Sequence, residues 1–470
     1  MQNVTHIAPA IAAFFFTATI VNFSGAHAPL AYFVGFLAVL ALGMCLVQLA
    51  KKFPSAGGYY TYVSRALGAR LGFLTGWMFT FYSPIVAGPL FAYFGLILEN
   101  ELKSNYGWTW FHWWMIVIVG IPLIALVGYL GIALSVRAIV IVGAMEFLIV
   151  LALSLWGLFD PGPGGFTFQS FNYNFNPSGI ATASGFSLAV VFTVQGLTGW
   201  EAAVPLAEET ENPRRNVPLA TMLSITIIGI MLVLAIWGQV IGWGTKNIAS
   251  LPASSELPAL VIAHRVWGSL WWLALLAMFT STIGGSLAAQ NVATRMWFGM
   301  GRSGVLPSTF GRVHPVRKTP QTAVTAQFIL SMALGLVLPV ILDPTKVFLL
   351  SIGYTLVLAV IFVYVIANIA VIKYYWTEAR AEWNWIYHLI FPVGTSAVLI
   401  YSVYKAFWPL PAHPYYWSPF IAGGWLVLGV IVLLVMNSRG DQTWMARAGE
   451  VIGERVETAE ELATQHPHAL

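Results

Sequence analysis

The chain has 470 residues, of which 58% are hydrophobic and only 9% are charged, and its formal net charge is +4. Soluble globular proteins carry about 25% charged residues, so this composition excludes a water-soluble globular protein and indicates a chain that folds within lipid. The single cysteine, Cys45, lies in an apolar run, which excludes a disulfide framework and a cysteine-based metal site.

Membrane-spanning helices need about 20 mostly apolar residues each. About twelve such stretches follow one another, and residues 1–13 lead directly into the first without the basic segment of a signal peptide. The sequence therefore predicts an all-α polytopic membrane protein with about 12 transmembrane helices. The stretches cover residues 3–25, 29–51, 69–98, 110–131, 134–158, 183–208, 217–243, 269–300, 321–341, 346–374, 386–407 and 417–436.

Basic residues are distributed unevenly among the connections. If the N-terminus is cytoplasmic, most of the 22 Lys and Arg residues fall on the cytoplasmic side. The positive-inside rule then predicts a protein of the cytoplasmic membrane with both termini in the cytoplasm. We expect a transmembrane domain over residues 1–436 and a cytoplasmic tail over 437–470. The basic residues left outside are Lys103, Lys246, Arg265, Lys346 and Lys405.

The sixth stretch contains a polar interruption, Phe192-Thr193-Val194-Gln195-Gly196-Leu197-Thr198-Gly199-Trp200-Glu201. Glycine lowers helix stability by about 1 kcal/mol relative to alanine. An unwound stretch at membrane depth is tolerated only where it is buried in protein or lines a cavity. Close helix packing through small residues is the alternative. The adjacent Glu201 favours a functional site, because ionisable groups within the membrane are costly and usually functional.

Two further helices carry polar side chains. Glu146 lies midway along the fifth stretch, so its carboxyl must be paired or protonated. A proton relay and a structural carboxyl bonded to a neighbouring helix are both open. In the eighth stretch Thr282, Ser286 and Gln290 share one helix face. That face either lines a polar path or bonds to a neighbouring helix.

Other motifs carry less chemistry. The turn at residues 54–58 lacks the strand, the helix and the Lys-Ser/Thr signature of a phosphate-binding loop. Residues 208–218 are typical of a solvated turn with no role in substrate binding. Histidine and acidic residues show no metal-ligand spacing, and no catalytic group set is evident. We therefore expect no cofactor, no nucleic-acid partner and no enzymatic activity.

Three segments resemble the amino acid–polyamine–organocation superfamily of permeases. They are FPSAGGYYTYVSRALG from residue 53, GWEAAVPLAEETENPRRNVP from residue 199, and AAQNVATRMWFGMGRSGVLP from residue 288. The resemblance implies two inverted five-helix repeats, about 1–158 and 183–374, with two further helices over about 386–436. It also implies that helices 1 and 6 are broken and face each other around the substrate.

The resemblance further implies the site residues. In such permeases amides of helix 1 hold the substrate carboxylate and carbonyls of helix 6 hold its amino group. Glu201 matches an acidic position that relatives implicate in proton response. The corresponding positions here are Pro9, Ala10, Ile11, Ala12 and Ala13 in helix 1, and Phe192, Gln195, Gly196, Leu197, Thr198, Gly199 and Trp200 in helix 6.

This sequence departs from the superfamily at two places. Helix 1 has an alanine-rich run where many relatives have glycine and serine, which leaves room for amines without an α-carboxylate. Gln195 stands where the similar arginine–agmatine exchangers place a gating tryptophan, so Phe192 and Trp200 are alternative gates.

Together these features predict a secondary active transporter of amino acids or related organic amines. It would work by alternating access, through proton coupling or exchange, with Glu201 and Glu146 as the proton-responsive candidates. Its expected partners are a small amine-containing substrate, protons and membrane lipid. A transporter-like sensor that binds without net transport is the alternative.

Overall fold

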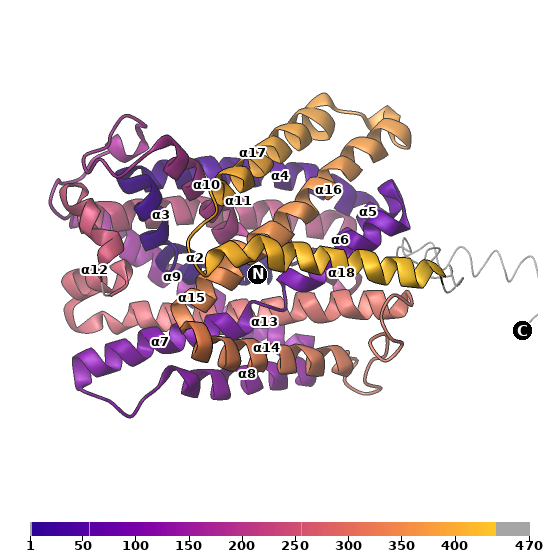
Figure 1. The fold of residues 1–470 in the computed structure, drawn as a ribbon, viewed down its shortest axis with the longest axis horizontal. Coiled ribbons are helices and arrows are strands. Elements are labelled where there is room, and N and C mark those ends of the chain that lie inside the picture. The colour runs from indigo at the N-terminus through magenta and orange to yellow at the C-terminus, as the bar shows by residue number, and fades with distance from the viewer. Residues whose placement is uncertain (1, 56, 255, 439–470) are drawn as a thin grey trace, which may run out of the picture.

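The computed structural model describes residues 2–55, 57–254 and 256–438. These residues form a bundle of α-helices with short 3-10 and π segments, and none of them forms a strand. Most of the long helices run roughly along the long axis of the molecule (Figure 1). The α-helices are α1 (Gln2–Ile7), α2 (Pro9–Phe14), α3 (Thr17–Ser24), α4 (Ala28–Lys52), α5 (Tyr59–Leu67), α6 (Ala69–Tyr82), α7 (Ala87–Tyr106), α8 (Trp113–Leu130), α9 (Ile132–Phe159), α10 (Ala183–Leu197), α11 (Pro213–Trp243), α12 (Pro258–Trp267), α13 (Trp272–Arg302), α14 (Gln321–Leu342), α15 (Pro344–Phe348), α16 (Leu356–Thr377), α17 (Phe391–Phe407) and α18 (Ser418–Ser438).

Ten helical stretches of the described chain are long and apolar enough to cross a membrane. They coincide with the expected second to fifth and seventh to twelfth stretches. The expected first and sixth stretches are not among them, because their regular helix is divided into shorter pieces. The ten are Thr17–Lys52, Ala69–Tyr106, Trp113–Leu130, Val140–Phe159, Pro213–Trp243, Trp272–Arg302, Gln321–Leu342, Pro344–Thr377, Ile386–Phe407 and Tyr415–Ser438.

Helix α11 shows how these helices divide their surface between protein and lipid. Leu219, Leu223 and Ile227 lie on one face and are each about half exposed. Ile225 and Ile228 lie on the opposite face and are fully buried. Large contiguous apolar surfaces are rare on water-soluble monomers, so the exposed face is suited to lipid.

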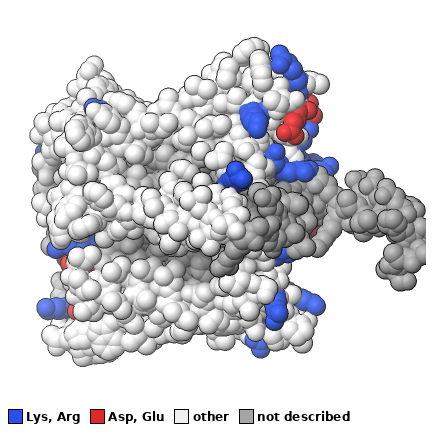
Figure 2. All heavy atoms as spheres, turned by 45° about the vertical axis from the view of Figure 1, so that its right-hand side comes forward, with Lys and Arg blue, Asp and Glu red and all other residues white. Residues whose placement is uncertain are grey.

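Figure 2 shows the same division over one face of the whole molecule, where charged side chains gather toward the ends and a broad uncharged band lies between them. The chain is therefore a multi-pass membrane protein.

One end of the bundle is richer in basic residues and is called the basic end below. It contains Lys51 and Lys52 at the end of α4, Arg302 at the end of α13, and Arg214 and Arg215 at the start of α11. This end lies to the right in Figure 1. The other end contains α12 and is called the opposite end.

The first apolar segment is interrupted twice. Ala8 has a φ of +54°, and Pro9 has no N–H to continue the hydrogen-bond ladder of α1, so α1 stops at Ile7. Helix α2 then ends at Phe14, and α3 begins at Thr17.

The sixth segment is also interrupted. α10 ends at Leu197, where Thr198 turns into an extended conformation and Gly199 adopts a φ of +111°. A 3-10 segment, η3 (Val204–Glu209), follows before α11. The helix expected to continue to residue 208 is therefore regular only to Leu197.

The connection between α11 and α13 contains a short α-helix, α12. The expected tail over 437–470 lies almost wholly outside the described residues, apart from the last two residues of α18.

Candidate functional site

The two interrupted segments lie in direct contact. A Cβ atom on Gly199 would lie 2.8 Å from the carbonyl carbon and oxygen of His6 and 2.9 Å from the amide nitrogen of Ile7. Both the backbone angle and this contact therefore require glycine at position 199. The turn after α10 is held against the end of α1 at the centre of the bundle.

A small cavity of about 50 Å³ lies where these segments meet, called the central cavity below. Its walls come from α1 and α2, the residues where α6 gives way to α7, the end of α10, the middle of α13, the π segment η6 (Leu349–Thr355) and the start of α16. The lining residues are His6, Ile7, Ala8, Ile11, Ala12, Phe16, Tyr82, Val86, Leu90, Gln195, Gly196, Thr198, Gly285, Ile352 and Leu356.

Polar groups of the lining retain unused hydrogen-bonding capacity. The side-chain oxygen of Gln195 and Nδ1 of His6 are buried and have no hydrogen-bond partner among the described residues. The Thr198 hydroxyl donates to the Val194 carbonyl at 3.1 Å, so its lone pairs can still accept. Most buried polar groups in proteins are hydrogen-bonded, so these atoms favour a polar ligand in the central cavity.

A buried hydrogen bond closes the cavity toward the basic end. The hydroxyl of Tyr82, which lines the cavity, donates to a carboxyl oxygen of Glu201 at 2.5 Å. The other oxygen of Glu201 accepts from the Gly199 amide at 3.2 Å. Glu201 is completely buried, so it holds α6 against the turn that follows α10.

Aromatic side chains complete this closure. Tyr59 packs against Tyr62 and Tyr364, with ring centroids 6.0 and 6.2 Å apart, and Trp200 packs against Tyr364 at 5.5 Å. All four rings are buried. These residues, together with Tyr82 and Glu201, are called the floor.

Aromatic side chains also cover the opposite side of the central cavity. Phe16 lines the cavity and packs against Phe192 at 6.2 Å and Phe348 at 5.4 Å. Phe15 and Tyr93 contact the other side of Phe348, at 5.6 and 4.6 Å. These five rings are called the roof.

A larger cavity of about 560 Å³ lies beyond the roof and opens toward the opposite end. Phe15 and Tyr93 line it, so the roof separates the two cavities. It also contains Glu101 and Glu256. Glu101 lies 3.8 Å from His264 and accepts a hydrogen bond from Asn105 at 3.0 Å. This space is called the vestibule.

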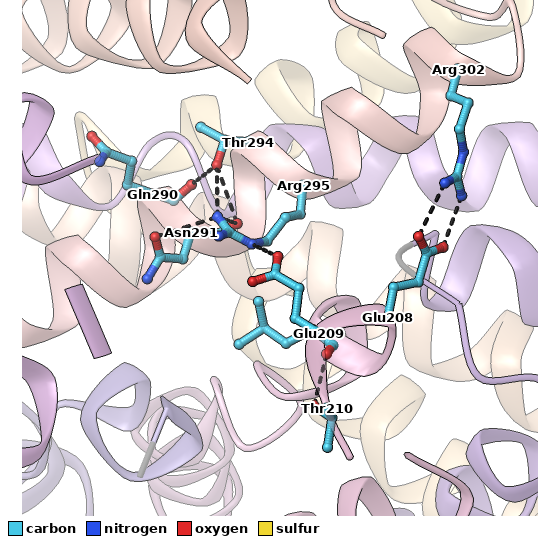
Figure 3. Close-up of polar contacts among 9 residues, drawn as sticks. Glu208, Glu209, Thr210, Gln290, Asn291, Thr294, Arg295 and Arg302 are labelled. Atoms are coloured by element: carbon cyan, nitrogen blue, oxygen red, sulfur yellow. Dashed lines mark hydrogen bonds and ion pairs between the residues drawn. The ribbon is translucent and has the colours of Figure 1, made fainter. Parts of the chain in front are cut away.

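Two ion pairs join η3 to α13 at the basic end (Figure 3). Glu208 receives two hydrogen bonds from Arg302, at 2.8 and 3.0 Å, and Glu209 pairs with Arg295 at 2.9 Å. The acidic turn expected to be merely solvated therefore fastens the end of the interrupted sixth segment to α13.

Glu146 lies outside the lining of the central cavity. It is completely buried, and neither carboxyl oxygen has a hydrogen-bond partner among the described residues. Ser281 of α13 is a polar neighbour, and its hydroxyl accepts a hydrogen bond from the amide of Ile11 at 3.3 Å. Because Ile11 lines the cavity, Ser281 lies between Glu146 and the cavity wall.

The structure brings some of the expected site residues together and places others elsewhere. Five line the central cavity: Ile11, Ala12, Gln195, Gly196 and Thr198. Outside the lining, Phe192 belongs to the roof, while Trp200 and Glu201 belong to the floor. Four of the others are fully buried around the interruptions, and Gly199 seats the turn against α1. Those four are Pro9, Ala10, Ala13 and Leu197.

On the polar face of α13, the structural alternative holds for Gln290 alone among the three expected residues. The Gln290 side chain donates to the Ile124 carbonyl of α8 at 3.0 Å, and Thr282 donates to a carbonyl of its own helix. Gly285 is the residue from this part of α13 that lines the cavity. None of Thr282, Ser286 and Gln290 lines the central cavity. The buried Ser286 hydroxyl has no hydrogen-bond partner among the described residues, so a polar path along this face stays a prediction.

Residues that sequence reasoning missed complete the lining. Tyr82 and Val86 flank the junction of α6 and α7, where Pro84 gave a signal of a turn. His6 precedes the Ala8–Pro9 interruption. Ile352 and Leu356 come from the tenth expected stretch, where Ser351, Gly353 and Thr355 interrupt the apolar run and the chain forms a π segment, η6 (Leu349–Thr355).

The chain matches the family model of amino acid permeases over residues 1–444. It is 26% identical over 309 residues to the low-affinity putrescine importer of Escherichia coli (strain K12), covering 63% of this chain and 64% of the importer. It is 26% identical over 268 residues to the L-methionine/branched-chain amino acid exporter of the same organism, covering 55% and 58%. Against the serine/threonine exchanger of Bacillus subtilis (strain 168) it is 23% identical over 344 residues, covering 71% and 74%. The matched region thus spans less than two thirds of the importer and of the exporter. The chain belongs to the amino acid permease family.

Proposed function

We propose that this protein is a secondary active transporter of amino acids or related organic amines that works by alternating access. The central cavity carries the proposal. It lies at two interrupted segments, contains unpartnered polar atoms, and is covered by aromatic side chains on both sides. Exposed backbone and polar groups at such interruptions are the means by which transporters bind small polar substrates at membrane depth.

The membrane arrangement follows from the segments and the charges. The interrupted segments 3–25 and 183–208 cross the membrane as broken helices 1 and 6, which brings the count to twelve. Residues 1–158 and 183–374 form two inverted repeats, each beginning with an interrupted segment, and 386–436 add two helices. The basic end faces the cytoplasm by the positive-inside rule, with both termini on that side of the cytoplasmic membrane.

Alternating access then assigns a role to each closure. Substrate enters the vestibule from outside and passes the roof, where Phe16 and Phe192 separate the two cavities. It binds beside Gln195 between the two interruptions. Opening of the floor and of the η3–α13 ion pairs then releases it to the cytoplasm. Trp200 belongs to the floor, so we assign outer occlusion to Phe192.

Glu201 and Glu146 are the proposed proton-responsive groups. Each is a buried carboxyl outside any ion pair recorded for the described residues, and ionisable groups at such positions are commonly part of proton pathways. Loss of a proton from Glu201 changes its bond with Tyr82 and therefore the floor. Glu146 acts on α2 through Ser281, which bonds to the Ile11 amide.

Reconstituted liposomes test this function. Radiolabelled putrescine, methionine, valine, serine and threonine, drawn from the substrates of the relatives, would be offered with and without an imposed pH gradient. Uptake stimulated by an acidic exterior supports proton symport, whereas uptake that requires internal substrate supports exchange. Binding without uptake under either condition would contradict transport and identify a sensor.

A further inference from the structure

We propose that the central cavity selects a net-neutral α-amino acid with a small apolar side chain, of about the size of alanine to valine. This inference rests on the proposed transport function and specifies its substrate class. It depends on the charge, polarity and volume of the lining.

Charge gives the first constraint. The lining contains no Asp, Glu, Lys or Arg among the described residues. Glu201 does not line the cavity, and its carboxyl already accepts the 2.5 Å hydrogen bond from the Tyr82 hydroxyl. A substrate with net charge would therefore be desolvated without a counter-ion in the wall, and this is costly in a protein interior. A zwitterion brings its own opposite charges.

The polar groups suit a zwitterion. The side-chain amide of Gln195 carries both an acceptor and donors, and its oxygen has no partner among the described residues. The lone pairs of Thr198 and Tyr82 can accept from an ammonium group, because each hydroxyl already donates its proton elsewhere. Acceptors and donors are thus present together without a fixed charge.

Volume and apolar surface set the side chain. A cavity of about 50 Å³ accommodates about four water molecules, at roughly 10–15 Å³ of such volume each. Phe16, Leu90 and Ile352 supply apolar contacts. A Cβ on Gly285 would already lie 3.0 Å from that of Ala8, so the wall there has no room for an additional atom. A small zwitterion already fills a cavity of this size, so its side chain must be short and apolar.

The acidic residues of the vestibule do not alter this selection. Glu101 and Glu256 lie beyond the roof, and Glu101 already contacts His264 and Asn105. A cation can be attracted there without being accepted in the central cavity. Selectivity for binding is therefore set by Gln195 and its neighbours.

A ligand series that holds the side chain constant tests the proposal. Purified full-length protein would be titrated calorimetrically with valine, valine methyl ester (net positive) and N-acetylvaline (net negative), and then with alanine, serine, lysine and phenylalanine. We expect valine and alanine to bind tightest and both charged derivatives to bind at least about tenfold more weakly, which corresponds to about 1.4 kcal/mol. Tightest binding of the methyl ester or of lysine would overturn the inference.

A matched pair of variants tests the same point by gain of function. Val86→Asp places a carboxylate in the lining, whereas Val86→Asn has nearly the same shape without charge. We expect Val86→Asp to improve binding of valine methyl ester relative to valine by about tenfold, and Val86→Asn to leave that ratio unchanged. An equal effect of both variants would contradict the role of charge.

An incorrect substrate class and an incorrect transport function would give different results. If lysine, putrescine or glutamate is transported in liposomes while valine and alanine are neither bound nor transported, the transport function stands and the substrate class is wrong. If no member of the series is bound or transported, the proposed function itself fails.

Discussion

Tyr82 offers the sharpest test of the floor. Tyr82→Phe removes the hydroxyl that donates to Glu201 at 2.5 Å and leaves a carboxyl oxygen buried without that partner. Once Glu201 has lost its proton, as in the proposed mechanism, the hydrogen bond from Tyr82 to its carboxylate contributes about 1.5–3 kcal/mol. If this bond exists only while the floor is closed, its loss shifts the equilibrium toward the floor-open state by about 10- to 100-fold.

Cysteine labelling measures that shift. The chain has one native cysteine, the buried Cys45, so Cys45→Ser gives a clean background. Thr198→Cys then places a thiol in the central cavity. An impermeant maleimide applied from the basic end should label it at least about tenfold faster in Tyr82→Phe.

Tyr62→Phe is the matched control for this experiment. The Tyr62 hydroxyl is equally buried but has no hydrogen-bond partner among the described residues, so its removal breaks no bond. We expect the labelling rate to stay within about twofold of the parent. Equal rates in Tyr82→Phe and Tyr62→Phe would refute the role given to the Tyr82–Glu201 bond.

Four further changes have distinct expected outcomes. Gly199→Ala should lower the melting temperature, because an alanine with positive φ costs about 1–2 kcal/mol and its Cβ would meet the His6 backbone. The control Gly423→Ala in α18 should leave the melting temperature unchanged, because the added Cβ would meet nothing within 4 Å. Equal melting temperatures of the two variants would show that the contact with His6 is unimportant. Gln195→Leu should abolish substrate binding yet keep or raise the melting temperature, because it removes an unpartnered buried carbonyl; retained binding in calorimetry would exclude Gln195 from the site. Glu146→Gln should flatten the pH dependence of liposome uptake, and an unchanged profile would remove Glu146 from coupling. A double-mutant cycle of Glu208→Gln and Arg302→Gln should give a coupling free energy of about 0.5–1 kcal/mol in thermal unfolding, and this coupling should weaken with added salt because the pair is partly exposed. A coupling free energy of zero would show that the pair does not stabilise the fold.

The membrane class and most helices could be predicted from the sequence. Apolar stretches of sufficient length are a local property, and ten of the twelve expected ones correspond to helices long enough to cross a membrane. The interruption near Gly196–Gly199 could also be predicted from the sequence, because glycine and polar residues break the apolar pattern locally. The end of α10 at Leu197 and the positive φ of Gly199 agree with that signal.

The composition of the cavity was harder to predict. Its lining joins segments that are far apart in the chain, and Val86, Ile352 and Leu356 look like any other apolar residues of membrane helices. The ion pairs of Glu208 and Glu209 likewise depend on where α13 ends, which local sequence does not reveal. The role of the polar side chains on α13 stayed open, because hydroxyl and amide groups on a helix face are equally suited to a polar path and to hydrogen bonds with backbone.

A crystal structure of the protein with valine or alanine bound tests the proposed site most directly. We expect ligand density in the central cavity, in contact with Gln195 and Thr198 and between the ends of α1 and α10. Density only in the vestibule near Glu101, or a continuous helix through residues 196–201 with no cavity beside it, would contradict the proposed site.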